Sequence, residues 1–339
     1  MTDPRAAQKT RFLRQAGWAG AEVRPLAGDA SNRRYDRLTG GPGGAGAVLM
    51  DSPPERGEDP APFLRITELL RARGFSAPEI LAADAASGFV LLEDLGDALF
   101  VRVCADRPGL EPELYAAAAE LLAELQSAPP PDGALPPYDA AVLRREAGLL
   151  TDWYLPAALD APVSDALAQD VARALDAAVA PVAQAREAVV LRDYHAENLL
   201  WLPERRGLAR IGLLDYQDAL AGHGAYDLIS LTEDARRDVA PEVRAATETR
   251  FIEAAGWQAE LFRAAAAALA AQRNLKIIGI FARLGRRDGK ARYVDLIPRV
   301  WAHLQRDLSH PALSDLRATI EAHVPAPEPS ALSRLRAPA

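Results

Sequence analysis

The sequence contains a single cysteine, Cys104, among its 339 residues. One cysteine excludes an intrachain disulfide and the common cysteine-based zinc sites, which need at least two. No cysteine–histidine motif surrounds Cys104. We therefore interpret it as a buried thiol rather than a catalytic nucleophile.

Long apolar runs are also missing, so no segment is expected to cross a bilayer. The first residues, "MTDPRAAQKTRFLRQAG", lack the apolar core of an export signal, and we expect a cytoplasmic protein. The formal net charge of −8 argues against general nucleic-acid binding. Neither a membrane nor a nucleic acid is therefore expected as a partner.

Lysine is scarce as well. Of the 39 basic residues only Lys9, Lys276 and Lys290 are lysine, and the others are arginine. No lysine occurs between Lys9 and Lys276. A reaction that depends on a lysine between these two positions would need another cation.

The length favours two lobes, and the patterning changes along the chain. The first ~95 residues predict short strands separated by Gly-rich turns, with one helix over "PAPFLRITELLRARGF". Helical periodicity dominates afterwards, including two helices over 258–288 broken near Gly279 or Gly285. The predicted fold class is α+β, with a small antiparallel sheet lobe, a larger mainly helical lobe and a ligand cleft between them. The predicted boundaries are 1–95, 96–325 and a flexible tail, 326–339.

A polar cluster lies in "VLRDYHAENLLWL", ahead of a second apolar run, "RIGLLDYQD". The two runs and the turn between them predict a β-hairpin. Facing residues of antiparallel strands lie about 4.5–5.5 Å apart, so Asn198 and Asp215 should meet at one edge. Amide and carboxylate oxygens suit Mg²⁺, which fills its other positions with water and phosphate oxygens.

Asp193 lies five residues before Asn198 and remains able to accept a hydroxyl proton from a nucleophile. Asp and Asn at loop ends usually shape turns, and each residue alone favours that interpretation. The three in this order below a small β-lobe favour kinase-type phosphoryl transfer. His195 is expected to support the loop, with an acceptor contact as the alternative, and Glu197 to be solvated or ion-paired.

The stretches "GDASNRRY", "FVLLEDLGD", "RDYHAENLLWL", "GLLDYQDALAGHGAYDLISL" and "RNLKIIGIFARL" resemble the aminoglycoside phosphotransferase-like kinases. This family is a branch of the bilobal protein-kinase-like fold. The resemblance extends over residues 26–300 and is closest to the N-acetylmuramate/N-acetylglucosamine anomeric kinases of bacterial cell-wall recycling. It implies ATP and Mg²⁺ as cofactors, an amino sugar as substrate and a sugar-1-phosphate nucleotidyltransferase as the next enzyme. The sequence leaves the oligomeric state and the preferred sugar open.

The resemblance also implies roles for individual residues. Asp193 is similar to the catalytic base, Asn198 and Asp215 to the Mg²⁺ ligands, and Asp227 to a support of the catalytic loop. The phosphate loop and the hinge imply a nucleotide-binding set, namely Gly28, Ser31, Asn32, Arg33, Arg34, Glu93, Asp94 and Leu95. The expected acceptor-facing residues are Arg192, His195, Gln217 and Asp218.

One position departs from the kinase pattern. Kinases of this fold carry a lysine on the third strand, paired with a helix glutamate, whereas "AVLMD" places Met50 there. Glu68 would be the glutamate partner. We interpret Met50 as typical of the sugar-kinase subfamily, with Arg33 and Arg34 as substitute cations.

Three hypotheses follow. The first is phosphorylation of the anomeric hydroxyl of N-acetylmuramate or N-acetylglucosamine, with Arg192, Arg273 or Arg283 as candidates to bind the lactyl carboxylate. The second is a kinase of the same fold acting on an aminoglycoside, choline or a homoserine-like acceptor. The third is a non-catalytic nucleotide-binding scaffold, which Met50 suggests and the intact trio of polar residues opposes.

Overall fold

The computed structural model describes residues 4–26 and 32–337. The chain divides into two compact units, one of residues 1–110 and 196–218 and the other of residues 111–195 and 219–339. The first, here called the sheet unit, is built around a five-stranded sheet, and the second, the helical unit, is mainly α-helical. Among the described residues no helix combines the length and apolar character that crossing a bilayer requires.

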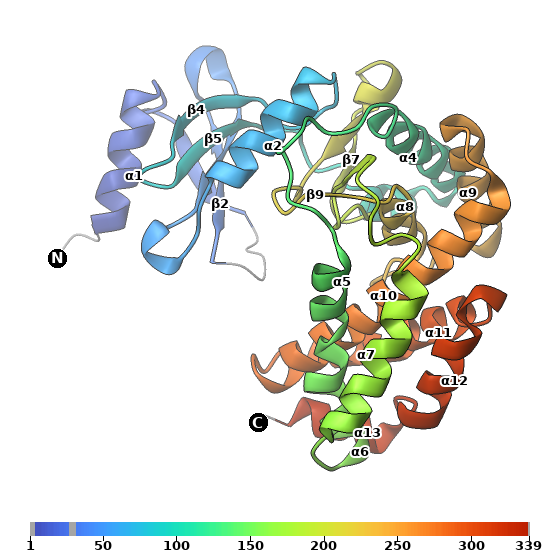
Figure 1. Ribbon diagram of the computed structural model, residues 1–339. Helices are drawn as coiled ribbons and strands as arrows, with labels where there is room; N and C mark the ends of the chain where they lie inside the picture. Colours follow the sequence, from blue (N-terminus) through green and yellow to red (C-terminus); the bar gives the residue numbers. More distant parts are fainter. Residues whose placement is uncertain (1–3, 27–31, 338–339) are drawn as a thin grey trace. The chain divides into compact units, whose positions relative to one another are not determined.

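The sheet of the first unit is antiparallel, with strand order β1-β2-β3-β5-β4 (Figure 1). The predicted small antiparallel sheet is therefore confirmed. The strands are β1 (Glu22–Pro25), β2 (Arg34–Thr39), β3 (Ala47–Asp51), β4 (Ile80–Asp84) and β5 (Phe89–Glu93). The helices of this unit are α1 (Pro4–Gln15), α2 (Ala61–Ala72) and α3 (Phe100–Asp106). Its hairpin strands are β7 (Leu199–Trp201) and β8 (Ile211–Leu213).

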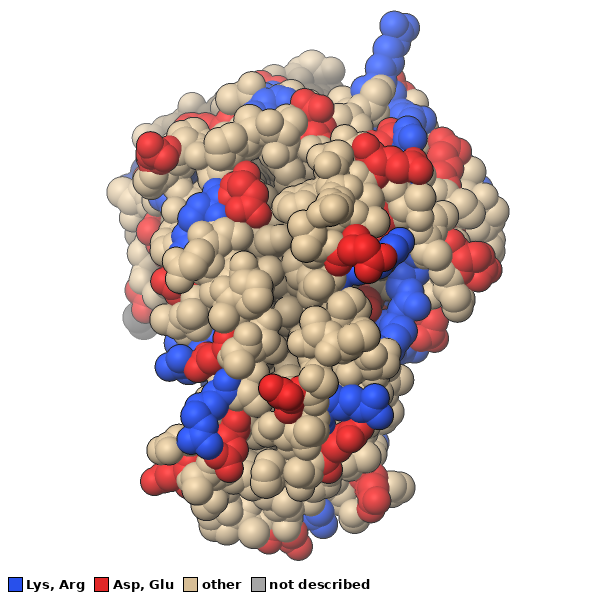
Figure 2. Space-filling view, turned by 45° about the vertical axis from the view of Figure 1, so that its right-hand side comes forward, with Lys and Arg blue, Asp and Glu red and all other residues tan. Residues whose placement is uncertain are grey.

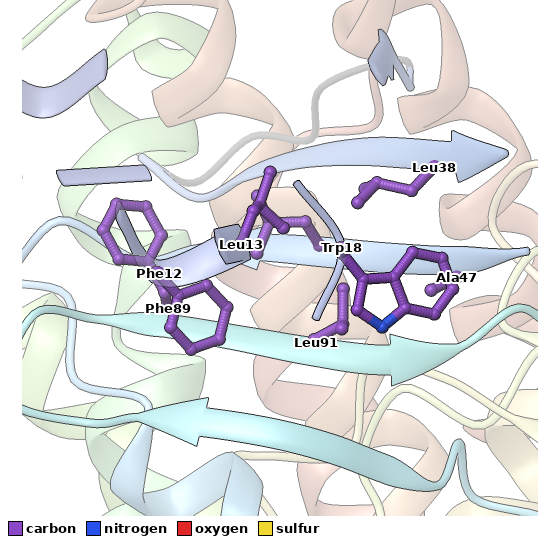
Figure 3. Close-up of a cluster of buried hydrophobic side chains, with 8 residues drawn as sticks. Phe12, Leu13, Trp18, Leu38, Ala47, Phe89 and Leu91 are labelled. Carbon is purple, nitrogen blue, oxygen red and sulfur yellow. The ribbon is translucent and has the colours of Figure 1, made fainter. Parts of the chain in front are cut away.

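Helix α1 covers one face of this sheet. Phe12 and Leu13 of α1 pack with Trp18 against side chains of β2, β3 and β5, as Figure 3 shows. Phe12 stacks on Phe89 with ring centroids 5.6 Å apart. The covered positions alternate along the strands, as the period of two requires, namely Leu38, Ala47, Leu49, Phe89 and Leu91. The residues between them therefore face the other side of the sheet.

The helical unit contains ten α-helices in its described residues, with one two-stranded pair of β6 (Ala188–Val190) and β9 (Leu220–Gly222). Side-chain caps begin two helices, because Asp139 and Ser164 accept backbone N–H bonds from Val142 and Leu167. The first five helices are α4 (Glu111–Leu125), α5 (Ala140–Ala147), α6 (Leu155–Leu159), α7 (Asp165–Val179) and α8 (Ala225–Thr232). The others are α9 (Pro241–Ala255), α10 (Ala259–Arg286), α11 (Ile297–Asp307), α12 (Ser314–His323) and α13 (Pro329–Arg336).

The predicted break within 258–288 is wrong, because α10 is continuous over 28 residues. Gly279 does not end the helix but lets another segment approach it. A Cβ atom at Gly279 would lie 2.3 Å from the carbonyl carbon of Leu149. A glycine in a helix interior often has such a packing reason.

The predicted boundaries also differ from the structure. The β7–β8 hairpin belongs to the sheet unit rather than to the helical one, because Leu213 donates its N–H to Ser76 O at 3.0 Å. The predicted flexible tail contains α13 instead. Its Ala331, Leu332 and Leu335 are buried, so apolar packing holds this segment.

The surface carries charges of both signs. On the face shown in Figure 2, basic and acidic side chains are interspersed and no large area has one sign. Many exposed pairs are in contact, such as Arg250 with Glu120 and Arg317 with Glu321.

Candidate active site

The hairpin brings Asn198 and Asp215 together in the sheet unit. Strand β7 pairs with β8 in antiparallel register, with Leu199 opposite Leu213. The N–H of Leu214 donates to Asn198 O at 3.0 Å, which extends the pairing to the edge. Asn198 Nδ2 then lies 3.4 Å from Asp215 Oδ2. The predicted proximity of these two side chains is confirmed.

The backbone of Asp215 has an unusual conformation. Its φ is +57°, in the left-handed region that non-glycine residues rarely occupy. Gln217 Nε2 donates to Asp215 Oδ1 at 2.8 Å, so the Gln217 amide contacts the aspartate directly. Asp218, the next residue, is exposed. Strained backbone conformations of this kind are frequent at functional sites, where the surrounding structure holds them in place.

The Asn198–Asp215 pair suits a magnesium ion. Both side chains supply hard oxygen atoms and both line the same cavity. Among the described residues no group of three or more His, Cys, Asp or Glu is arranged to hold a metal. A metal at this pair would therefore need further oxygen ligands from a nucleotide and from water. Mg²⁺ is usually bound in this way in phosphoryl-transfer enzymes.

That cavity lies within the sheet unit and has a volume of about 330 Å³. Apolar side chains of β3, β5 and the hairpin form its walls, including Val48, Leu92 and Leu200. The predicted hinge residues Glu93, Asp94 and Leu95 all line it. Within the described part of the chain the N–H of Leu95 has no hydrogen-bond partner. A cavity with apolar walls and a free backbone donor at its edge suits a nucleobase.

The predicted phosphate-loop residues have different positions. Gly28 and Ser31 lie outside the described residues. The Asn32 N–H donates to Glu58 Oε1 at 3.1 Å, and Arg33 Nε donates to Glu58 Oε2 at 2.9 Å. Glu58 therefore already neutralises Arg33.

Arg34 is the remaining arginine of that loop, and strand alternation places it on the face of β2 that points away from the cavity. Arg34 shares its face of β2 with Asp36 and Leu38, which is the face that α1 covers. Tyr35 and Arg37 line the cavity instead. Arg37 Nε lies 2.8 Å from Asp94 Oδ2, and its Nη1 lies 2.6 Å from Asp97 Oδ2. The sequence interpretation missed Arg37, although the alternation within "RRYDRL" could have indicated it.

Met50 occupies the cavity side of β3. It lies two residues after Val48 on the same face, opposite Tyr35 in the register, and is fully buried. Glu68, the expected glutamate partner, is exposed on α2. The inward position next to it is Thr67, which is fully buried. The strand–helix ion pair of other kinases is therefore replaced here by uncharged side chains.

The segment that carries Asp193 belongs to the helical unit, where Asp227 holds its backbone. The Asp227 carboxylate accepts N–H bonds from Leu191 at 2.6 Å and from Arg192 at 2.8 Å. Ser230 Oγ donates to Arg192 O at 3.2 Å, and Arg273 Nη2 donates to Ser230 Oγ at 2.9 Å. Arg192 has a φ of +73°. Arg273 is thus used to support the loop rather than to face a substrate.

Cations surround the Asp193 carboxylate. Asp193 is solvent-accessible, and the protein packed around it opposes ionisation. Lys276, with further contributions from Arg192 and Arg273, outweighs this desolvation and lowers the pKa of Asp193. A carboxylate that is ionised at neutral pH can accept a proton.

Lys276 belongs to a cluster that the sequence interpretation missed. Its Nζ lies 3.0 Å from Glu146 Oε2 and 3.3 Å from Tyr226 OH. Glu146 also pairs with Arg192, and Tyr138 OH donates to Glu146 Oε2 at 2.6 Å. Two cations thus share one carboxylate, and the ionised Asp193 beside them balances the remaining positive charge. The scarcity of lysine was the available signal, since Lys276 is one of three in the chain.

His195 lies buried behind the loop. Its Nε2 is 3.3 Å from Arg236 Nη1, and because a guanidinium only donates, Nε2 acts as the acceptor. Burial lowers the pKa of His195 to about 4, so the ring is neutral at physiological pH. This geometry agrees with the loop-supporting role that we predicted.

The fold and these residues define the class of the protein, a phosphotransferase of the protein-kinase-like fold. The chain belongs to the phosphotransferase enzyme family, whose model matches residues 22–262. A relative from Caulobacter vibrioides, called N-acetylmuramate/N-acetylglucosamine kinase, is 38% identical and covers 96% of this chain and 98% of its own. A relative of the same name from Pseudomonas aeruginosa is 38% identical over 88% of this chain and 89% of its own.

Solved structures show the same fold at low sequence identity. An ADP-bound aminoglycoside phosphotransferase superposes with a TM-score of 0.58 and 13% identity, covering 90% of this chain and 97% of its own. The ethanolamine kinase of Plasmodium vivax has a TM-score of 0.60 and 12% identity, covering 87% and 84%. The kinase-like fold that the sequence predicted is confirmed.

Proposed function

We propose that this protein transfers the γ-phosphoryl group of ATP to the anomeric hydroxyl of N-acetylmuramate, N-acetylglucosamine or both. The products are ADP and the sugar 1-phosphate. The observation that carries the proposal is the near full-length similarity to kinases named for these two sugars. The sheet unit supplies a nucleotide cavity with its Asn–Asp pair, and the helical unit supplies an ionised aspartate.

In the proposed reaction the adenine lies in the cavity of the sheet unit, and the N–H of Leu95 donates to a ring nitrogen. Asn198 and Asp215 would hold Mg²⁺, which neutralises charge on the transferred phosphoryl group. Asp193 accepts the proton of the anomeric hydroxyl. The hydroxyl oxygen bonds to the γ-phosphorus, and the bond between that phosphorus and the ADP oxygen breaks. Because Asp193 starts ionised, no earlier deprotonation is needed.

The cluster around Lys276 supports an anionic acceptor. N-acetylmuramate differs from N-acetylglucosamine by a lactyl carboxylate, for which Lys276 and Arg192 are the nearby cations. ATP as the donor and a sugar as the acceptor imply action in the bacterial cytoplasm. A sugar-1-phosphate nucleotidyltransferase would then consume the product.

The test is ADP release with Mg-ATP against N-acetylmuramate, N-acetylglucosamine, kanamycin and choline. We expect turnover with one or both amino sugars and a phosphate on C1, identified by ³¹P and ¹³C spectra. Turnover with kanamycin or choline alone would refute the sugar assignment. No turnover with any acceptor would favour the nucleotide-binding scaffold.

A further inference from the structure

A buried contact inside the sheet unit connects α2 to the residue that follows the metal-binding aspartate. We propose that Tyr216 and Thr67 are positioning residues that hold Asp215 in its metal-binding conformation. They would replace the strand-lysine–glutamate pair that this chain lacks. The proposal rests on the proposed function only in taking Asp215 as a ligand of Mg²⁺-nucleotide, and not on the identity of the acceptor.

The hydrogen bond between the two hydroxyls has a defined direction. Thr67 Oγ1 and Tyr216 OH lie 2.8 Å apart, and both residues are buried, at 0% and 1% exposure. Thr67 Oγ1 also lies 2.8 Å from the carbonyl oxygen of Phe63, to which it can only donate. A threonine hydroxyl has a single proton, so Tyr216 must donate to Thr67. The bond completes a chain from Tyr216 through Thr67 to the backbone of α2.

Ring packing adds a second connection between the same elements. Phe63 and Tyr216 are stacked, with centroids 5.3 Å apart and planes inclined by 14°. Phe63 also lines the nucleotide cavity. Phe63 and Thr67 are four residues apart and therefore share one face of α2, whereas Glu68 points away and is exposed. The inward face of α2 is therefore occupied by the contact with Tyr216, and Glu68 is not part of it.

The connection matters because of the backbone of Asp215. A non-glycine residue with a φ of +57° persists only where its neighbours over-determine it. On its N-terminal side, Leu214 is held by the hairpin bond to Asn198. On its C-terminal side, Tyr216 is the adjacent residue and is anchored on α2. Asp215 is thus fixed from both sides without an ion pair at the position of Met50.

Two conservative variants isolate this role. Tyr216→Phe removes one hydroxyl and leaves Thr67 still donating to Phe63 O. Thr67→Val keeps the shape of the side chain and removes the acceptor. The matched controls are Tyr154→Phe and Thr247→Val in the helical unit. Tyr154 is a buried tyrosine that donates to Pro325 O, and Thr247 is a buried threonine that donates to Val243 O, four residues earlier.

The measurement is ADP binding by calorimetry across a Mg²⁺ titration of the full chain, without sugar. We expect Tyr216→Phe and Thr67→Val each to raise the half-saturating Mg²⁺ concentration about three- to tenfold, the effect of one hydrogen bond. Metal-free ADP affinity should stay within about twofold of the parent. Because both changes break the shared Tyr216–Thr67 bond, the double variant should shift no further than the larger single shift.

Three outcomes would overturn the inference. The first is an unchanged Mg²⁺ requirement in both variants. The second is an equal loss of metal-free ADP binding, which indicates a general packing defect. The third is a parent protein whose ADP binding ignores Mg²⁺. Since no acceptor is present, failure of the sugar assignment leaves this result intact. The shift in the Mg²⁺ requirement would then be observed in a protein that is inactive on these sugars or acts on another acceptor.

Discussion

Asp227 and Arg192 are joined by a hydrogen bond in which the aspartate Oδ1 accepts the backbone N–H of Arg192 at 2.8 Å. Arg192 immediately precedes Asp193 and has a φ of +73°. The same carboxylate accepts the N–H of Leu191 through its other oxygen. One buried side chain therefore fixes the turn that presents the proposed base.

Changing Asp227 to Asn should disturb that turn. An amide has one acceptor oxygen, so its NH₂ group would face one of the two N–H donors. We expect the free energy of unfolding to fall by about 1–3 kcal/mol, and kcat to fall at least tenfold. Thermal denaturation and steady-state kinetics measure both. Asp139→Asn is the control, because Asp139 caps one N–H and asparagine caps equally well. Equal behaviour of the two variants would contradict the role of Asp227.

Asp193→Asn should abolish most of the turnover. The amide cannot accept the hydroxyl proton, so we expect kcat to fall by roughly 10³-fold, within the range of general-base catalysis. The Kd for ADP should change less than threefold, since the proposed nucleotide cavity lies in the sheet unit. Glu197→Gln, at an exposed position in the same loop, should retain activity. If Asp193→Asn kept the parent kcat, another group would have to be the base.

Arg37→Ala should weaken ATP binding more than Arg34→Ala. Arg37 lines the cavity and neutralises Asp94 and Asp97, so its loss leaves two carboxylates beside a polyanionic ligand. We expect the KM for ATP to rise about five- to tenfold for Arg37→Ala and less than twofold for Arg34→Ala. The KM for the sugar should change little in either. The reverse order would restore the original interpretation that Arg34 faces the phosphates.

Met50→Lys should not restore a kinase ion pair. Met50 is fully buried and Glu68 is exposed on α2, so the new ammonium would lack its partner. We expect the free energy of unfolding to fall by about 3 kcal/mol, with no gain in kcat/KM. Met50→Leu conserves volume and should cost less than about 1.5 kcal/mol. A higher kcat/KM in Met50→Lys would show that this position can accommodate a phosphate-binding cation.

His195 should make stability depend on pH. Its pKa is lowered from 6.5 to about 4 in the folded state, so the unfolded chain binds the proton more readily. The contribution is complete above pH 6.5 and is lost as the pH falls towards 4, by up to about 3 kcal/mol.

His195→Gln provides the comparison, because glutamine can accept from Arg236 but does not titrate. Burial raises the pKa of Asp227 to about 7, which has the opposite sign and cancels in the difference between the two proteins. The free energy of unfolding of the parent should therefore fall relative to His195→Gln from pH 6.5 to pH 4. Parallel curves over this range would show that His195 is not held neutral.

Much of the site could be predicted because its determinants are local. The hairpin register follows from two apolar runs and the turn between them, and it places Asn198 beside Asp215. Strand alternation likewise separates Arg34 from Arg37 into opposite faces. The residue types alone, an amide and two carboxylates at this spacing, indicate phosphoryl transfer and agree with the family that the chain belongs to.

Only the tertiary structure decided which face of the sheet and which face of α2 point towards the site. Packing of α1 on one side of the sheet assigns Arg37, and not Arg34, to the cavity. Tyr216 selects Thr67 over Glu68 as the inward residue of α2, across 149 positions of sequence. Gly279 lies inside an unbroken helix, at the point where the backbone at Leu149 comes too close for a side chain. Each of these depends on contacts between segments distant in sequence, which local periodicity and turn chemistry do not encode.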